Sequence, residues 1–372
     1  MLMDYLQDLI TPAFVFCVIV VLGYFLGKIK VFSVSLDVAG ILIVAIGLGY
    51  ILSRYFNSIF HTEFGMVLSN YSKLGSSLFA SVIGITAGFG INRRSAKKSL
   101  IYFSIGAIAV LAGTISAKLI AAIDENISRS VILGVLCGAL TSTPGLASVC
   151  EMENVVPELA TIGYGIAYLF GVVGVVLYVQ IAAKKLPAVK CDDNVRNKSK
   201  YQGVECLVIL CMVSVIGQII GSINIPLANF TLGTTGVTVI CGIVSGMFIN
   251  RLCGIKGKIE DTLPIFRNFG LVLFIAGNGV AAGRQINANL ELKWFVYGAI
   301  ITIVSLAVSE IIGRVIFRNK TVDRMALIAG AMTSTPAIGV VTKKTTDESI
   351  LVIYSLSYLG ALMSILFLIR IL

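Results

Sequence analysis

Charged residues are scarce in this sequence, and histidine is almost missing. Asp, Glu, Lys and Arg make up 13% of the 372 residues, hydrophobic residues make up 57%, and there is one histidine. Soluble domains carry about 25% charged residues, so the composition excludes a soluble globular protein and predicts a chain embedded in a lipid bilayer. No H-E-x-x-H or G-x-S-x-G motif is present, so the sequence offers no recognisable metal or nucleophile set for an intramembrane enzyme.

Paired cysteines are missing as well. The eight cysteines include no C-x-x-C pair, so the sequence predicts no zinc site, no disulfide framework and no resident cofactor. The net charge is +10, but the basic residues lie in short loops between apolar stretches. Such a distribution indicates orientation in a membrane rather than nucleic-acid binding.

Ten apolar stretches are each long enough to cross the roughly 30 Å hydrocarbon layer as a helix. They lie near residues 12–29, 37–55, 74–92, 99–122, 160–184, 202–221, 232–250, 266–284, 294–316 and 349–370. Two further apolar segments, near 129–150 and 324–343, are interrupted in the middle by Thr-Ser-Thr-Pro. Because proline removes a backbone donor and disfavours helix at the preceding residue, each of these two segments is predicted to form two short helices joined at the motif.

The basic loops indicate whether the interrupted segments cross the membrane or turn back. Loops 93–98 and 184–200 are rich in Lys and Arg, and such loops stay on the cytoplasmic side. Two crossings separate these loops if segment 129–150 is re-entrant, and three if it spans. The re-entrant interpretation is therefore favoured, and it predicts a multi-pass inner-membrane protein with both termini outside.

The two halves of the chain align with each other. Residues 138–149 (GALTSTPGLASV) match residues 330–341 (GAMTSTPAIGVV) at a constant shift of 192. Five spans and one re-entrant element per half make an odd number of crossings, so the second half is predicted to be inverted relative to the first. We expect an all-α membrane protein with a first repeat at 1–185, a cytoplasmic linker at 186–201 and a second repeat at 202–372.

Inverted repeats with paired broken helices are typical of secondary transporters, whose binding site lies where the breaks meet near the bilayer midplane. Backbone N–H groups, helix N-termini and hydroxyls at the two motifs would then bind a substrate carboxylate. The alternative is that the motifs only kink packed helices. The candidate substrate-binding residues are Thr141, Ser142, Thr143, Pro144, Gly145, Thr333, Ser334, Thr335, Pro336 and Ala337.

Four further polar residues in apolar stretches are candidates for a role in transport. Asn278 is expected to contact a substrate or a cation, or to form a hydrogen bond between helices. Glu310 is expected to pair with Arg314 one turn away, and as an intramembrane carboxylate it is also a candidate for coupling. Tyr168 and Tyr358 are interpreted either as aromatic belt residues at the membrane interface or as lining of the translocation path.

The motif GALTSTPGLASV, the run GYGIAYLFGVVGVVLYV at 163–179 and the second copy GAMTSTPAIGVV resemble the aspartate:alanine exchanger family of bacterial transporters. The resemblance covers nearly the whole chain. Many members carry a soluble regulatory domain between the halves, whereas only the linker lies there in this sequence. The resemblance therefore implies a short form in which regulation by such a domain is not expected.

The resemblance implies exchange of small amino acids or dicarboxylates, so the expected partners are a small anionic or zwitterionic solute and the lipid bilayer. A wider similarity to elevator-type transporters implies a moving unit, a fixed scaffold and a homodimer. Symport coupled to Na⁺ or H⁺ stays open as an alternative, because neither cation leaves a distinctive ligand cluster in the sequence. A channel is a further alternative.

Overall fold

The computed structural model describes residues 11–31, 34–35, 38–55, 62–91, 96–183, 203–222, 233–251, 259, 261–284, 291–318, 320–342, 345 and 349–372. Over these ranges the chain is helical, apart from turns, short connecting segments and a two-residue antiparallel pair, β1 (Lys30–Val31) with β2 (Val34–Ser35). The predicted all-α class is thus confirmed. The predicted linker 186–201 and the side chain of Thr335 lie outside the described residues.

Both halves of the chain have the same order of elements. The helices of the first half are α2 (Pro12–Gly27), α3 (Val38–Tyr55), α4 (Thr62–Ile91), α5 (Ala96–Ile123), α6 (Arg129–Ala139), α7 (Thr143–Cys150) and α8 (Pro157–Ala183). Those of the second half are α9 (Gly203–Gly221), α10 (Gly233–Arg251), α12 (Leu263–Arg284), α13 (Lys293–Phe317), α14 (Thr321–Ala331), α15 (Thr335–Thr342) and α16 (Ser349–Leu368). Each Thr-Ser-Thr-Pro motif divides one apolar segment into two short helices, as predicted.

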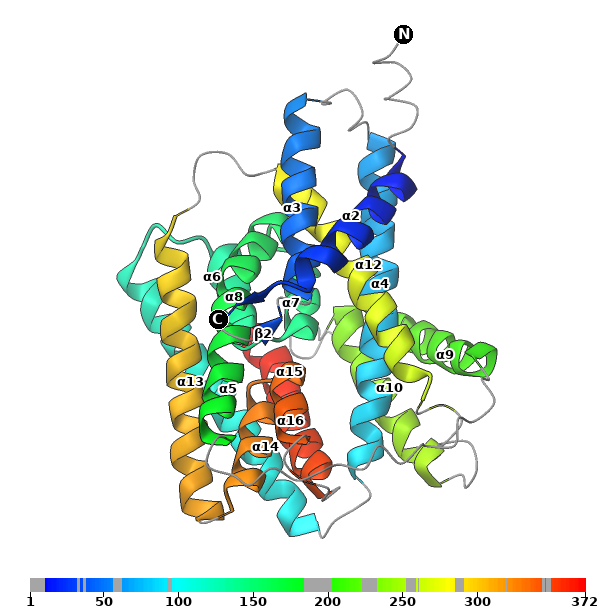
Figure 1. Cartoon of the computed structure of the whole chain (residues 1–372). Coiled ribbons are helices and arrows are strands. Elements are labelled where there is room, and N and C mark those ends of the chain that lie inside the picture. The colour runs from blue at the N-terminus through cyan, green and yellow to red at the C-terminus, as the bar shows by residue number, and fades with distance from the viewer. Residues whose placement is uncertain are drawn as a thin grey trace.

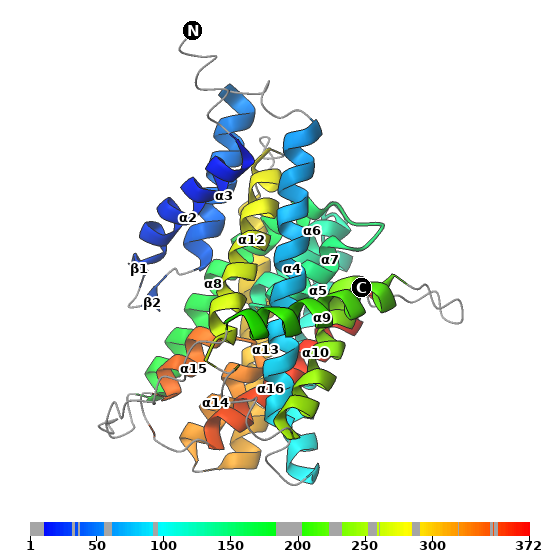
Figure 2. The ribbon, with the colours of Figure 1, turned by 90° about the vertical axis from the view of Figure 1, so that its right-hand side faces the viewer.

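The helices pack into two groups, which we call the panel and the core (Figure 1). The panel contains α2, α3, α4, α9, α10 and α12, and the core contains α5 to α8 and α13 to α16. Within the panel, α4 runs almost the whole height of the molecule beside α10 and α12 (Figure 2). Helices α4 and α10 approach closely because Gly84 faces Gly242 at their crossing, where a Cβ on either glycine would lie 2.8 Å from the other's Cα.

The outer surfaces of several helices are apolar. Six of the described helices, α5, α8, α9, α12, α13 and α16, contain segments long and apolar enough to cross a membrane, and α2, α3, α6 and α10 are shorter apolar helices. Helix α9 exposes Val208, Met212, Val215 and Ile219. Apolar faces of this extent fit contact with lipid, so the structure supports a multi-pass membrane protein.

Candidate functional site

Each broken segment is capped at its break by a threonine in the left-handed backbone region. Thr141 has φ 55° and Thr333 has φ 47°. At the first break, the N–H of Thr141 donates to Gly138 O and the N–H of Ser142 donates to Cys137 O. This is the Schellman pattern, in which glycine usually occupies the left-handed position. A β-branched residue there is strained by about 1–3 kcal/mol, so the threonine side chain must supply something that glycine lacks.

The two threonine hydroxyls supply hydrogen bonds between the breaks. Thr141 Oγ1 donates to the carbonyl of Met332 over 2.7 Å, and Thr333 Oγ1 donates to the carbonyl of Leu140, also over 2.7 Å. These reciprocal bonds, which we call the threonine clasp, are buried and join residues about 190 positions apart in the sequence. The predicted meeting of the two motifs is therefore what the geometry shows.

The first broken segment turns back on itself at its break. Helix α6 packs in parallel against α8, since Gly134 lies beside Ala160 and Gly138 lies beside Tyr164. The starts of these helices are also neighbours, because the N–H of Val156 donates to Ser130 Oγ over 2.9 Å. Helix α7 must therefore run back toward the start of α6. We call α6–α7 hairpin 1 and the equivalent pair α14–α15 hairpin 2.

The two hairpins enter the core from opposite ends. Helices α5 and α13 are antiparallel, because Asp124 after α5 pairs with Lys293 at the start of α13 (2.9 Å), whereas Tyr102 near the start of α5 stacks on Phe317 at the end of α13. Hairpin 1 begins at residue 129, shortly after Asp124, and hairpin 2 begins at residue 321, shortly after Phe317. The tips meet between these ends, near Gly113, whose Cβ position lies close to Leu140.

The tip of hairpin 1 is closed by protein partners. Ser142 Oγ accepts the N–H of Gly145 over 3.2 Å, and the hydroxyls of Thr143 and Tyr164 are 3.0 Å apart. Gly145 faces protein, because a Cβ there would lie 3.0 Å from Ser142 Oγ. Pro144 is buried as well.

The tip of hairpin 2 differs from this arrangement. Ser334 Oγ is buried and has no hydrogen-bond partner among the described residues. Ala337, which stands where hairpin 1 has Gly145, is buried, whereas Pro336 is half-buried. The two tips thus share a backbone conformation, but Ser142 Oγ has a hydrogen-bond partner and Ser334 Oγ has none among the described residues.

The tyrosines after the hairpins do not form an aromatic belt. Tyr164 is fully buried and stacks on Tyr168 with ring centroids 5.0 Å apart, and Tyr168 and Tyr358 are each 9% exposed. The belt interpretation of Tyr168 and Tyr358 is therefore wrong, because belt residues would lie at the outer surface of the protein. These rings pack in the core beside the hairpins instead.

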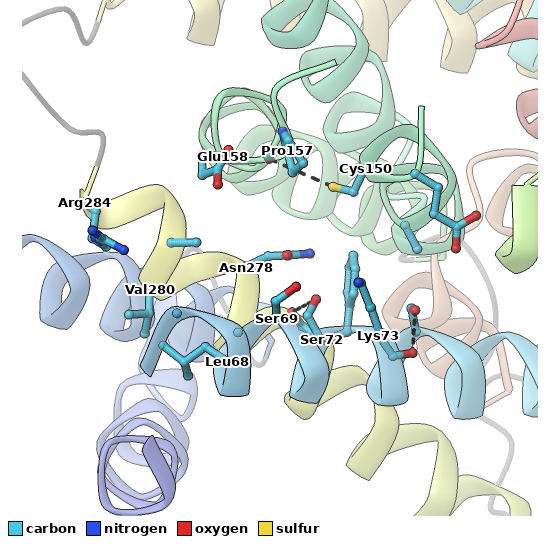
Figure 3. Close-up of a pocket in the computed structure, with 17 residues that line it drawn as sticks. Leu68, Ser69, Ser72, Lys73, Cys150, Pro157, Glu158, Asn278, Val280 and Arg284 are labelled. Carbon is cyan, nitrogen blue, oxygen red and sulfur yellow. Dashed lines mark hydrogen bonds between the residues drawn. The ribbon is translucent and has the colours of Figure 1, made fainter. Parts of the chain in front are cut away.

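Asn278 lies in a cavity between the panel and the core (Figure 3). The cavity has a volume of about 400 Å³ and lies between α4, α12 and the segment from α7 to the start of α8. Asn278 Nδ2 is buried and has no hydrogen-bond partner in the part of the chain that the structure describes. Both interpretations of Asn278, contact with a substrate or cation and a hydrogen bond between helices, therefore stay predictions, and its Nδ2 makes no bond between helices among the described residues. The cavity touches α7 at Ala147 and Cys150, beyond the hairpin tip.

Charged groups of both signs line the cavity. Its basic residues are Lys73 on α4 and Arg284 on α12, and its acidic residues are Glu151 and Glu158. Ser69, Ser72 and Ser76 of α4 add hydroxyl groups to the same wall. A cavity of this size with opposite charges and an unpartnered amide can hold a small polar or zwitterionic molecule.

Glu310 is held by two arginines. Its side chain pairs with Arg314 over 2.5 Å, as predicted, and with Arg324 of α14 over 3.2 Å. The second pair was not predicted, because residue 324 lies on a different helix. Glu310 therefore joins α13 to the base of hairpin 2, and it lies apart from the cavity that Asn278 lines.

The serine face of α4 was not predicted from the sequence. The predicted span began at residue 74, whereas the helix begins at Thr62, because Lys73 and the serines lower the hydropathy of its first turns. The spacing of Ser69, Ser72 and Ser76 places them on one helical face. A search for polar residues at this period would have found the wall of the cavity.

Comparison with known proteins finds similarity to membrane permeases and transporters. A family model described as a predicted permease membrane region matches residues 15–184 and 209–372. An uncharacterized transporter of Bacteroides fragilis is 38% identical over 169 residues, which is 45% of this chain and 28% of that protein. An uncharacterized transporter of Desulfotalea psychrophila is 32% identical over 204 residues, which is 53% of this chain and 34% of that protein. The matched part of this chain thus covers about a third of the length of these curated relatives.

Proposed function

Because this chain belongs to the aspartate:alanine exchanger family of predicted membrane permeases, we propose that it exchanges small carboxylate-bearing solutes across the bacterial inner membrane by alternating access. Aspartate, alanine and small dicarboxylates are the leading solutes. In this proposal the second half is inverted relative to the first, both termini lie outside, and the carrier works as a homodimer.

The observation that carries the proposal is the meeting of two hairpins that enter from opposite ends. Carriers with inverted repeats place irregular backbone at membrane depth, where short helix ends can face a solute. Here α7 and α15 both begin at the clasp formed by Thr141 and Thr333. The N-terminus of a helix attracts a carboxylate through its free N–H groups and dipole.

The groups that line the cavity beside Asn278 support the proposal that the solute carries a carboxylate. Lys73 and Arg284 can attract a carboxylate, and Asn278 Nδ2 offers a donor without a described protein partner. Glu151 and Glu158 can attract an ammonium group, which suits an amino acid. We infer that the solute enters through this cavity and reaches the hairpin tips when the core moves relative to the panel.

A symporter is the second candidate, and two buried hydroxyls favour it. Ser305 Oγ and Ser334 Oγ have no hydrogen-bond partner among the described residues. Ser305 lies beside Gly113, in the region where the tips meet. Hydroxyl and carbonyl oxygens are the ligand type that hard cations prefer, so Na⁺ bound near the tips would couple uptake to a sodium gradient.

The experiment that separates these functions is uptake of labelled aspartate by proteoliposomes containing the purified protein. The vesicles are empty or preloaded with aspartate, alanine or succinate, with and without an inward sodium gradient. An exchanger takes up label only into preloaded vesicles. Sodium-driven uptake into empty vesicles would support the symporter, and flux that neither saturates nor depends on the opposite side would indicate a channel.

A further inference from the structure

Glu151 follows hairpin 1 and reaches across to the panel. Its carboxylate accepts hydrogen bonds from the hydroxyl of Thr234 (2.7 Å), from the N–H of Thr235 (3.1 and 3.0 Å to its two oxygens) and from the hydroxyl of Thr235. Thr234 and Thr235 form the first turn of α10. A carboxylate at this position satisfies free N–H groups and complements the positive end of the helix.

Arg370 and Gly233 complete the contact. Arg370, in the turn that follows the core helix α16, donates through Nη2 to Ser148 Oγ of α7 over 3.1 Å. Gly233 has φ +70°, and a Cβ there would lie 2.5 Å from Glu151 Oε2 and 2.6 Å from Arg370 Nη2. Glycine therefore allows the carboxylate and the guanidinium to reach the same helix end. We call Glu151, Thr234, Thr235 and Arg370 the Glu151 latch.

The second hairpin has no matching contact in the part of the chain that the structure describes. Helix α7 packs against both α10 and α4 of the panel, whereas the main neighbours of α15 are α8 and α14 of the core. Every residue from Thr143 to Val149 is buried, but Gly339 of α15 is exposed and borders open space. The sequence shift of 192 places Lys343 where the first half has Glu151. A lysine cannot accept hydrogen bonds from a helix N-terminus.

We propose that the Glu151 latch holds the hairpin 1 end of the core against the panel and that it must release α10 in each transport cycle. The inference rests on the proposed alternating access. It assigns to Glu151 a gating role that its equivalent in the other half cannot have. Because Glu151 also lines the cavity beside Asn278, opening of the latch widens the mouth of that cavity.

The test measures thiol reactivity and needs no substrate. Cys150 ends α7 and lines the same cavity, so its labelling rate by a maleimide reports opening at this end. The protein is purified into lipid nanodiscs, where the reagent reaches both faces, and a Cys150→Ser variant identifies the signal of this thiol. Glu151→Ala is expected to raise the labelling rate about fivefold or more, because several charge-assisted hydrogen bonds are lost at a partly exposed site. Glu151→Gln is expected to raise it less.

Glu158→Gln is the matched control, since Glu158, like Glu151, lies near the Cys150 thiol and lines the same cavity, whereas the hydrogen bonds to α10 are made by Glu151. It measures how much the loss of a nearby charge alone changes the rate, and it should label well below the rate of Glu151→Gln. If Glu151→Ala does not elute as a monodisperse protein, the comparison of Glu151→Gln with Glu158→Gln decides. Equal labelling of Cys150 in Glu158→Gln and the Glu151 variants would overturn the latch. A faster rate in a protein that transports none of the tested solutes would leave the latch standing and count against the proposed solutes alone.

Discussion

Two threonines with strained backbones carry the contact between the halves. Thr141 and Thr333 occupy left-handed positions where glycine would be easier to accommodate. Each hydroxyl donates a hydrogen bond to a carbonyl of the other hairpin tip. Strain of this kind is tolerated where the surrounding structure enforces it and is frequent at functional sites. The identical placement in both halves indicates that the strain is retained for the clasp.

Replacing Thr333 with valine tests the clasp, because valine keeps the β-branch and loses the donor. We expect Thr333→Val to lower the free energy of unfolding by about 1–3 kcal/mol, since the buried carbonyl of Leu140 loses this donor, and to slow exchange. Thr333→Ser should keep most of the free energy of unfolding and most of the exchange rate, because serine retains the hydroxyl donor. Thr86→Val is the control, because the Thr86 hydroxyl bonds Val82 O within its own helix. Thermal unfolding in detergent and counterflow give the two readouts, and equal behaviour of Thr333→Val and Thr86→Val would contradict the clasp.

For Asn278 we expect a substitution to reduce transport without lowering stability. Its amide nitrogen has no hydrogen-bond partner among the described residues, so Asn278→Ala should leave the melting temperature within about 2 °C of wild type and reduce solute uptake. A residue that only joined helices would behave in reverse, with a lower melting temperature and unchanged uptake. Melting curves and initial uptake rates of the same preparations distinguish these results.

At the scale of elements, the sequence predicted most helix positions and missed their partners. The lengths of the apolar stretches placed the ends of α3, α5, α8 and α13 within a few residues, because the thickness of the hydrocarbon layer sets the length of a spanning helix. Charge placement indicated the reversal at hairpin 1. The wall of the cavity and the partners of Glu310 lie on different helices, and which helices meet depends on packing that no single segment encodes. The start of α4 was missed because residues facing a polar cavity need not be apolar.

The ion pairs of Glu310 fix the base of hairpin 2. Glu310→Gln should destabilise the protein by about 3 kcal/mol, because Arg324, whose side chain is only 15% exposed, loses its charged partner in a largely buried pair. The double variant Glu310→Gln with Arg324→Gln should recover part of this loss. Chemical or thermal unfolding of the two single variants and the double variant measures the coupling. Additive losses would show that the pair is not an anchor.

At the opposite end of the core, Asp124 predicts a pH dependence of stability. The pKa of Asp124 is lowered from its ordinary value, first by its hydrogen bond with Lys293. A carboxylate with a lowered pKa in the folded state contributes stability at pH values above its unfolded pKa, and this contribution is lost as the pH falls through the folded pKa. The melting temperature should therefore fall on acidification below about pH 4, and Asp124→Asn should lower it at pH 7 and weaken the acid dependence. An unchanged acid profile in Asp124→Asn would refute this assignment.

The whole molecule consists of a panel and a core, and the cavity beside Asn278 lies between them. The core carries both hairpins, and the panel contacts it at the end of hairpin 1 through the Glu151 latch. The sequence repeat predicted that the two motifs meet, and the structure shows how they are bonded. The sequence repeat could not predict that, among the described residues, the two ends of the core contact the panel unequally, because this difference depends on how the panel and the core pack together.

Alternating access requires the hairpin tips to face each side of the membrane in turn, so the accessibility of residue 334 to a thiol reagent tests it. Ser334 is fully buried and its hydroxyl has no described partner, so Ser334→Cys gives up no described hydrogen bond. Proteoliposomes of this variant and of the wild type are treated with a membrane-impermeant thiol reagent outside or trapped inside, and counterflow is then measured. We expect the reagent to inhibit the variant from either side and excess aspartate to change the rate of inhibition. Inhibition from one side only, or full counterflow after treatment on both sides, would contradict it.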